Sequence, residues 1–285
     1  MRLINHRESG LGAVVTAGGI DRVLALPGTL EELLADEAML ADARSAVAGA
    51  DPNALPEVDQ GMLLAPVRPG KIICIGYNYR HHVPDGADPT ADPDYPDVFL
   101  KTPNVLVGPA DPVRIPSVPA DVDYEGEIAV VIGRRASNVT AEAASTHIGG
   151  YSLFNDVTAR DWQRRTSQWA LGKSFDTFGP LGPWIVTADD VPDPHQLLVE
   201  VERDGLVTVS QSTSTMIFAI PFLVHYLSQV MTLEPGDIIA TGSPQKLAVG
   251  QSTHRPLAPG DAVTVRVAGI GELTTTFLAP LGGKA

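Results

Sequence analysis

Short apolar runs separated by glycine and proline fill the chain from about residue 63 onward, and they constrain the fold more than any other feature of the sequence. The runs are KIICIG, VFLKTPNVLVG, EIAVVIG, GPWIVT, LLVEVERDG, DIIATG and AVTVRVAGIGELTTTFL. Their β-branched residues predict strands, and the segments RDG, EPGD and APGD predict tight turns between strands. Helical patterns are scattered among these runs, which favours an α+β fold with a rolled or sandwiched sheet over a regular βαβ succession.

The chain of 285 residues is expected to divide into a small N-terminal module, residues 1–65, and a larger catalytic domain, residues 66–285. In the module, the glycine pair at 18–19 predicts a hairpin-like turn between two short strands. Residues 29–50 of the module have the spacing of a helix.

Helix signals elsewhere are fewer. The helix in the module is expected to start after Thr29, with Glu32 completing a capping box. A second helix is expected from Thr140 to Gly149. A third is expected within residues 214–233, and it is apolar nearly all round, which predicts that it is buried.

Charge and composition exclude several classes of function. The net charge is −14 and the pI is about 4.8, which argues against a nucleic-acid partner. No apolar run reaches the length of a membrane span, and the first residues lack an apolar signal core, so a cytoplasmic protein is expected. The single cysteine, Cys74, lies in an apolar run and is expected to be buried and inert.

Three acidic residues suggest a metal site. Glu125 and Glu127 lie two residues apart at the start of an apolar strand, so both side chains point to the same face. Asp156 follows a second apolar stretch, where a strand end would expose it. Three carboxylates without Cys or His select Mg²⁺, Mn²⁺ or Ca²⁺. A wet strand face that carries two acids is the alternative that this spacing leaves open.

The order of the motifs resembles that of the fumarylacetoacetate hydrolase superfamily, in particular its acylpyruvate hydrolases, oxaloacetate decarboxylases and hydroxydiene-dioate isomerases. The resemblance covers about residues 63–280. Its motifs are LLAPVRPGKIICIGYNYRHH, VFLKTPNVLVGP, VDYEGEIAVVIG, GGYSLFNDVTARDWQ, GKSFDTFGPLGPWIV, LEPGDIIATGSP and LAPGDAVTVRVAGIGEL. It implies a mixed β-sandwich roll with a small N-terminal module, a homodimer, and a bound Mg²⁺ or Mn²⁺.

The same resemblance assigns roles to individual residues. The metal ligands of the family fall on Glu125, Glu127 and Asp156, and its active-site lysine falls on Lys173. The positions that contact the substrate fall on Arg160, Gln163 and Thr241. A structural role for Arg160, paired with Asp161 or Asp156, is the alternative.

The expected general base is less regular. In the motif GYNYRHH, His82 matches the histidine that activates water in the hydrolases. Its partner position holds Asp85 where the family has Glu, and Pro84 disfavours the short helix that would join the two. Residues 80–97, rich in Pro and Asp, are either a solvated loop or a lid. Lys246 stands where many members have glycine, and it either favours a second anionic group or points to solvent.

The leading expectation is therefore a divalent-metal-dependent hydrolase that cleaves a C–C bond of acylpyruvate-type 2,4-dioxo acids, with the metal stabilising the departing pyruvate enolate. The alternatives are an oxaloacetate decarboxylase or a hydroxydiene-dioate isomerase that uses the same metal. A weak pairing of His82 with Asp85 would favour these alternatives, since hydrolysis needs a base for water. A non-catalytic binding protein is disfavoured by the acidic triad and Lys173.

Overall fold

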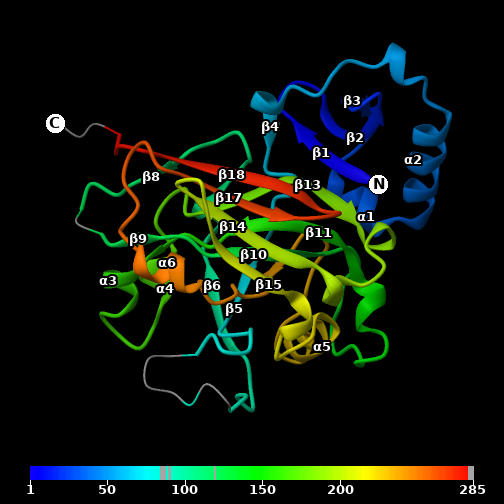
Figure 1. Ribbon diagram of the computed structural model, residues 1–285. Coiled ribbons are helices and arrows are strands. Elements are labelled where there is room, and N and C mark those ends of the chain that lie inside the picture. The colour runs from blue at the N-terminus through cyan, green and yellow to red at the C-terminus, as the bar shows by residue number, and fades with distance from the viewer. Residues whose placement is uncertain (84–87, 89–90, 119, 282–285) are drawn as a thin grey trace.

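The computed structural model describes residues 1–83, 88, 91–118 and 120–281, and Figure 1 shows their arrangement. The strands are β1 Arg2–His6, β2 Gly10–Ala17, β3 Ile20–Ala25, β4 Leu63–Leu64, β5 Ile72–Gly76, β6 Asp97–Lys101, β7 Leu106–Val107, β8 Val113–Arg114, β9 Val122–Asp123, β10 Gly126–Ile132, β11 Ile148–Asn155, β12 Thr158–Ala159, β13 Gly179–Thr187, β14 Leu198–Arg203, β15 Leu206–Ser212, β16 Ile238–Ala240, β17 Ala262–Val267 and β18 Gly271–Leu278. The helices are α1 Leu30–Ala35, α2 Glu37–Gly49, α3 Arg160–Gln163, α4 Ala170–Lys173, α5 Ile220–Val230 and α6 Ala248–Ser252. None of the helices in these ranges is long and apolar enough to cross a membrane.

One large mixed sheet forms the centre of the molecule, with the order β3-β2-β1-β13-β11-β10-β16-β5-β6. Its inner strand β10 is buried along its whole length, because antiparallel β11 and β16 flank it and other elements cover both faces. The strands of the N-terminal module extend this sheet, since β1 pairs antiparallel with β13. The region predicted to form an N-terminal module thus shares one sheet with the strands that follow it.

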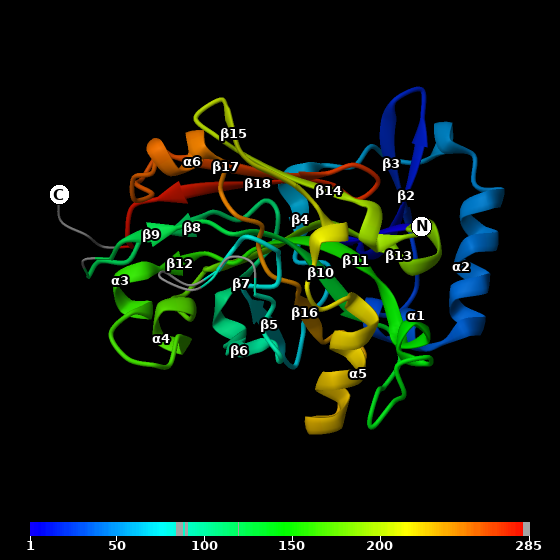
Figure 2. The ribbon, with the colours of Figure 1, turned by 60° about the horizontal axis from the view of Figure 1, so that its bottom comes forward.

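A second sheet packs against the first. It has the order β15-β14-β17-β18-β8, and Figures 1 and 2 show it lying across β10 and β11. The two sheets approach so closely at Gly126 that a Cβ there would lie 2.6 Å from Val201 Cγ2 and 2.8 Å from Val265 Cγ2. Asn155 Nδ2 donates to Thr275 Oγ1 across the same junction at 3.1 Å. The expected α+β sandwich roll is confirmed.

The helices follow the sequence signals in part. Thr29 and Glu32 form the expected capping box, but the helical segment is two helices, because the side chain of Asp36 accepts from the Ala38 and Met39 amides and starts α2. The helix expected from Thr140 to Gly149 is wrong.

Only a short 3₁₀ turn, Ala144–His147, forms in that segment. The residues after it begin β11, where Gly149 packs against Gly133 so closely that a Cβ on Gly149 would lie 2.9 Å from the Gly133 Cα. Pairing of β11 with β10 therefore decides the conformation at Ile148 and Gly149 over the helical spacing.

The molecule has two distinct ends in both views. The helices α3, α4 and α6 gather near β9 at one end, while β1–β3 and α2 lie at the other (Figures 1 and 2). The acidic residues singled out from the sequence lie toward the first end. A pocket of about 670 Å³ opens there, lined by residues from β5, β6, β9, β10, α3, α4 and the segment that follows β16.

Candidate active site

The pairing of β10 with β11 brings the three predicted metal ligands together. Gly126 lies opposite Asn155 in this register, so Glu125 and Asp156 are the next residues beyond the pair. The Asp156 amide donates to the Glu125 carbonyl at 2.8 Å, which fixes the two segments side by side. Glu127 follows on the same face of β10 as Glu125. All three carboxylates line the pocket.

Two buried lysines neutralise part of this acidic cluster. Lys101, at the end of β6, donates to Asp156 Oδ1 at 2.5 Å, and Lys173, at the end of α4, donates to Asp156 Oδ2 at 2.5 Å and also to Glu125. Burial lowers the pKa of Lys173, but Asp156 and Glu125 more than offset this and the net shift is upward. Lys101 keeps a lowered pKa, since burial outweighs Asp156. The active-site lysine predicted at 173 thus lies within the predicted ligand set.

Glu127 is the carboxylate that lacks a cation. It is 2 % exposed and accepts from the Gly242 amide at 2.9 Å. Burial raises the pKa of Glu127 well above its usual range, and the neighbouring Asp156 and Glu125 raise it further. Within the described ranges no Lys, Arg or His head group lies at ion-pair distance from Glu127.

An added cation would relieve this repulsion, and three oxygen donors suit Mg²⁺ or Mn²⁺. The chemistry of the donor set therefore fits a divalent ion. In the part of the chain that the structure describes, no three His, Cys, Asp or Glu side chains are yet arranged to hold one together. Lys173 occupies the space between Glu125 and Asp156. The metal assignment of Glu125, Glu127 and Asp156 stays a prediction.

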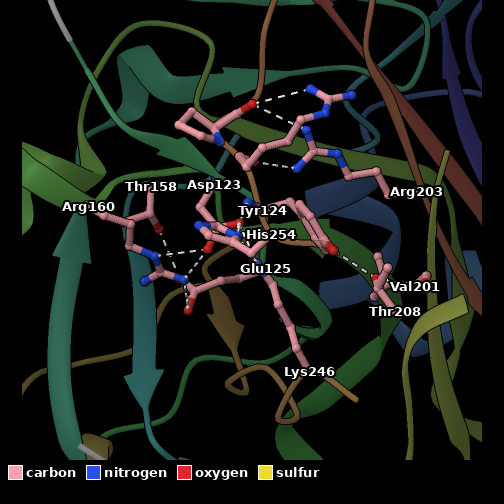
Figure 3. Close-up of polar contacts among 12 residues, drawn as sticks. Asp123, Tyr124, Glu125, Thr158, Arg160, Val201, Arg203, Thr208, Lys246 and His254 are labelled. Carbon is pink, nitrogen blue, oxygen red and sulfur yellow. Dashed lines mark hydrogen bonds and ion pairs between the residues drawn. The ribbon is translucent and has the colours of Figure 1, made fainter. Parts of the chain in front are cut away.

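A second charged cluster adjoins the first through Arg160. The Arg160 guanidinium donates to Asp123 Oδ2 from Nε at 3.1 Å and from Nη2 at 3.0 Å, and its Nη2 lies 3.0 Å from Glu125 Oε1 (Figure 3). Gln163 Oε1 accepts from Arg160 Nη1 at 3.2 Å. Lys246 Nζ donates to the other oxygen of Asp123 at 2.5 Å. Arg160 therefore pairs with Asp123 and Glu125, not with the two aspartates considered from the sequence.

The predicted base also lines this pocket. His82 Nδ1 is 2.7 Å from the Ser243 carbonyl oxygen, and because a carbonyl only accepts, Nδ1 carries the proton of the neutral ring. The lone pair of that ring is then on Nε2. Asp85, the predicted partner, lies outside the described residues, so the carbonyl of Ser243 is the orienting group that the structure shows.

Buried Asn78 fixes the loop that carries His82. Its Nδ2 donates to the carbonyls of Phe218 at 3.1 Å and Thr241 at 2.8 Å, and its Oδ1 accepts from the Phe218 amide at 2.8 Å. On either side of it, Tyr77 and His81 take left-handed backbone conformations, with φ of 51° and 72°. The chain is thus turned so that Tyr77 and His82 face the pocket.

Aromatic rings line the side of the pocket next to Lys173. Trp169 makes edge contacts with Tyr77 and Phe99, with ring centroids 5.8 Å and 5.4 Å apart, and Tyr77 meets the His82 ring in the same way at 5.5 Å. Lys173 Nζ lies 4.8 Å from the centroid of Phe99. Such a wall excludes water from the space beside the lysine and the carboxylates, which strengthens electrostatic interactions there.

Thr241, predicted to contact substrate, is placed differently from the other predicted residues. Its side chain is buried, its hydroxyl donates to the Ile128 carbonyl at 3.0 Å, and it is not among the residues that line the pocket. Gln163, Arg160, Lys173 and His82 do line it. Cys74 is buried as expected, and burial raises the pKa of its thiol.

Sequence reasoning missed several residues of this site. Asp123 continues the alternation of Glu125 and Glu127 toward the N-terminus, so three acids at every second position were the signal that could have found it. Lys101, a lysine that ends an apolar strand, carried a weaker signal. His254 lines the pocket from a segment without a recognisable motif.

Comparison with known proteins identifies the family. Residues 71–278 match the family described as fumarylacetoacetate (FAA) hydrolase C-terminal, which is more than half of the chain. The chain belongs to the fumarylacetoacetate hydrolase family. The family match covers the whole of the acidic cluster, both lysines that contact it and the segment that carries Lys246.

Relatives in this family carry several enzyme names. The human protein named oxaloacetate tautomerase FAHD2A, mitochondrial, is 39% identical over 263 residues, which cover 91% of this chain and 82% of that protein. The crystal structure of a 5-carboxymethyl-2-hydroxymuconate delta-isomerase from Mycobacterium smegmatis has a TM-score of 0.79 at 34% identity and covers 98% of this chain and 100% of its own. A maleylpyruvate hydrolase from Sphingobium sp. SYK-6, solved with manganese(II) ion and pyruvate, has a TM-score of 0.79 at 30% identity and covers 98% and 99%. These relatives support an enzyme of the family that acts on oxo acids.

Proposed function

We propose that this protein is a divalent-metal-dependent enzyme that forms the enolate of a 2-oxo acid, with proton transfer at carbon as its reaction. The observation that carries the proposal is the pocket itself, where three carboxylates, a buried lysine and an oriented histidine converge. A divalent ion bound by Glu125, Glu127 and Asp156 would supply Lewis acidity toward the keto oxygen of the substrate.

The remaining groups act on the substrate directly. His82 Nε2 is the base that takes a proton from the carbon next to the keto group and returns it. Lys173 supplies positive charge next to the developing enolate, in a site that aromatic rings shield from water. Arg160, held by Asp123 and Glu125, presents its guanidinium to the anionic substrate.

Relatives named tautomerase and isomerase support proton transfer at carbon over activation of water. The His82 ring is oriented through Nδ1 by the Ser243 carbonyl, which leaves Nε2 as the base for the α-carbon of a 2-oxo acid whose keto group is polarised.

Hydrolysis of acylpyruvates is the second candidate, supported by the neighbour named maleylpyruvate hydrolase. The two candidates share the enolate and differ in whether water attacks the distal carbonyl. Decarboxylation of oxaloacetate is a third outcome that the same groups support, since it needs no base for water.

A parallel assay tests the proposal. Wild type, Asp156→Ala and His82→Asn would be incubated with Mg²⁺ or Mn²⁺ and with oxaloacetate or acetylpyruvate. Faster enol–keto conversion of oxaloacetate without CO₂ release, lost in both variants, supports the proposal. Release of acetate and pyruvate from acetylpyruvate assigns the hydrolase instead. Release of CO₂ that survives His82→Asn but not Asp156→Ala assigns a decarboxylase.

We also propose a cytoplasmic homodimer, as the family resemblance implied. Light scattering coupled to gel filtration tests the oligomer: a mass of twice 30.1 kDa supports it, and a mass of 30.1 kDa contradicts it.

A further inference from the structure

The pocket continues beyond the acidic cluster to a wall formed by the segment after β16. Lys246, Gln251 and His254 from this segment line the pocket together with Arg164. In this wall Lys246 and His254 lie beside Asp123, whereas Gly242 and Ser243, earlier in the same segment, contact Glu127 and Glu125. The proposed reaction uses none of Lys246, Gln251, His254 and Arg164.

Lys246 is held rigidly in this wall. The Leu247 amide donates to the Thr208 carbonyl at 2.8 Å, and Gln251 Nε2 donates to the Lys246 carbonyl at 2.9 Å. Gly250 packs so closely on β15 that a Cβ there would lie 2.7 Å from the Thr208 carbonyl oxygen. The backbone of Lys246 is therefore fixed by contacts on both sides.

The side chain of Lys246 is fixed at its head but still reachable. Its ammonium lies 4.2 Å from the centroid of the Tyr124 ring and donates to Asp123, and 17% of the side chain is exposed. Tyr124 is in turn held by the donation of its hydroxyl to Thr208 Oγ1 at 2.8 Å (Figure 3). A ligand in the pocket can therefore reach this ammonium without a rearrangement of the wall.

Lys246 is a surplus cation for the carboxylate that it contacts. Asp123 Oδ2 already accepts two N–H groups from Arg160, and Asp123 Oδ1 accepts from the Tyr124 amide at 2.9 Å as well as from Lys246. Of the three ammonium N–H groups, one is given to Asp123, and His254 Nδ1 lies 3.5 Å away. The described residues offer the third no partner, so it remains for a ligand.

The balance of charges in and around the pocket also favours an anionic ligand beside Lys246. Four carboxylates, on Asp123, Glu125, Glu127 and Asp156, face four head groups, on Lys101, Arg160, Lys173 and Lys246. A bound divalent ion would add two positive charges to this balanced set, and Arg164 adds one at the rim. A ligand that carries two negative charges offsets the charge of the ion and leaves only the excess charge of Arg164, whereas a monoanion leaves a larger positive excess.

The two places where a dianionic ligand would bring its carboxylates, one beside Lys246 and one at the acidic cluster, lie close together. Arg160 Nη2 contacts both Asp123 and Glu125, so one guanidinium separates the Lys246 wall from the acidic cluster. Asp123 and Glu125 are two residues apart in an extended chain, which corresponds to a backbone distance of about 6.6 Å. This is the span of a short carbon chain with a carboxylate at each end.

We propose that Lys246, assisted by His254, binds the distal carboxylate of a short dicarboxylic 2-oxo acid and sets the preference of this enzyme for dianionic over monoanionic substrates. The inference rests on the proposed function, because it assigns the substrate class of the same site. Lys246 acts on binding, and the proton transfer is left to His82.

Calorimetric titration with a matched pair of ligands tests this subsite. 2-Oxoglutarate and 2-oxovalerate share a five-carbon skeleton and the 2-oxo acid group, and they differ in the terminal carboxylate. With Mn²⁺ present, wild type is expected to bind 2-oxoglutarate about tenfold more tightly or better, as a charge-assisted hydrogen bond allows. Equal affinities in wild type would overturn the proposal without any variant.

Variants then assign the preference to Lys246. Lys246→Met should remove the preference and leave the affinity for 2-oxovalerate unchanged, and Lys246→Arg should keep part of it. Asp123 retains Arg160 in these variants, so folding should persist, and Lys246→Gln keeps a neutral donor if Lys246→Met does not fold. Arg266→Met, which removes an exposed cation paired with Glu202 and Glu272, is the control for net charge and should behave as wild type. A preference that survives in Lys246→Met overturns the proposal.

The outcomes separate the subsite from the reaction. An intact preference without turnover would reject the proposed function and keep the subsite. Turnover without the preference would reject the subsite and keep the function. Both readouts use the same full-length protein.

Discussion

Asp123 and Glu127 lie four residues apart on one extended segment, and both are buried, yet the charges around them shift their pKa values in opposite directions. Burial alone would raise the pKa of Asp123, but Arg160 and Lys246 outweigh it and hold that pKa below its usual range. Burial also raises the pKa of Glu127, and there Asp156 and Glu125 add to the effect. Burial therefore sets a cost for a carboxylate, and the nearest charges decide whether that cost is offset.

The comparison separates two roles along a single extended segment, with Asp123 at the end of β9 and Glu127 in β10. Asp123 is saturated by donors and holds Arg160 and Lys246 in place. Glu127 has no ion-pair partner among the residues that the structure describes, which suits a metal ligand. Five substitutions test this contrast between Asp123 and Glu127 and the packing around it.

Asp156→Ala should have the largest effect, because it removes the partner of two buried lysines. Lys101 and Lys173 would be left with a buried positive charge, and breaking a buried ion pair costs about 3–5 kcal/mol. The free energy of unfolding, measured in urea, should fall by that amount and activity should be lost. Asp189→Ala, at an exposed ion pair with Arg44, is the control and should change stability little. Unchanged stability of Asp156→Ala would contradict the burial of these charges.

Asp123→Asn should lower stability by about 3 kcal/mol, since Arg160 and Lys246 would then face a neutral group in a buried site. The affinity for Mn²⁺ should change less than the stability. Urea denaturation and calorimetric titration of Mn²⁺ measure the two quantities on the same sample. A loss of Mn²⁺ affinity at unchanged stability would reverse the roles that we assign to Asp123 and Glu127.

Glu127→Gln should show the converse pattern. An amide removes the repulsion from Asp156 and Glu125, so the melting temperature should be kept or raised. The affinity for Mn²⁺ and the value of kcat/KM should fall by about 100-fold or more, at least what is lost with outer-shell partners of a metal. Glu272→Gln, at a side chain that is 62% exposed, is the matched control. Retained Mn²⁺ affinity would remove Glu127 from the ligand set.

Gly126→Ala tests whether the close approach of the two sheets sets the positions of Asp123 and Glu127. The new methyl group would meet Val201 and Val265 at less than van der Waals distance, which costs about 1–3 kcal/mol. Thermal unfolding should show the loss. Gly49→Ala is the control, since nothing lies within 4 Å of a Cβ at this exposed end of α2. Equal stability of the two variants would show that the sheets separate easily at this point.

His195→Gln should have the smallest effect on the melting temperature, and it serves as a reference away from the pocket. His195 Nε2 accepts from the Ile220 amide at 3.0 Å, and burial lowers its pKa below the usual value despite Asp193. The neutral ring therefore stabilises the fold above the ordinary histidine pKa, and this stability is lost as the pH falls through the lowered pKa. The melting temperature of wild type should fall in that range relative to His195→Gln, which accepts the bond at every pH. Parallel pH curves of the two proteins would contradict this.

Much of the site was predictable because it depends on local alternation. Glu125 and Glu127 share a face because successive side chains of an extended chain point to opposite sides. The apolar run after them predicts that the strand is buried. The same rule applied one step further would have found Asp123. The helix expected at 140–149 is wrong, and at its end, Ile148 and Gly149, pairing of β11 with β10 outweighs the local helical pattern.

Contacts between distant segments were beyond the reach of the sequence. Lys101 meets Asp156 across 55 positions, and Lys246 meets Asp123 across 123 positions. No periodicity specifies these pairs, since they arise when β6 and the segment after β16 are brought to the same end of the large sheet.

The strands, the sandwich roll and the acidic alternation at residues 123–127 follow from the order of residues alone, because backbone geometry and hydrophobic patterning act over short distances. The tertiary structure decided which of those acids meets a cation. Ion pairing in a buried site depends on which segments exclude water around it, and that is settled only when the two sheets and the loops at their ends have packed.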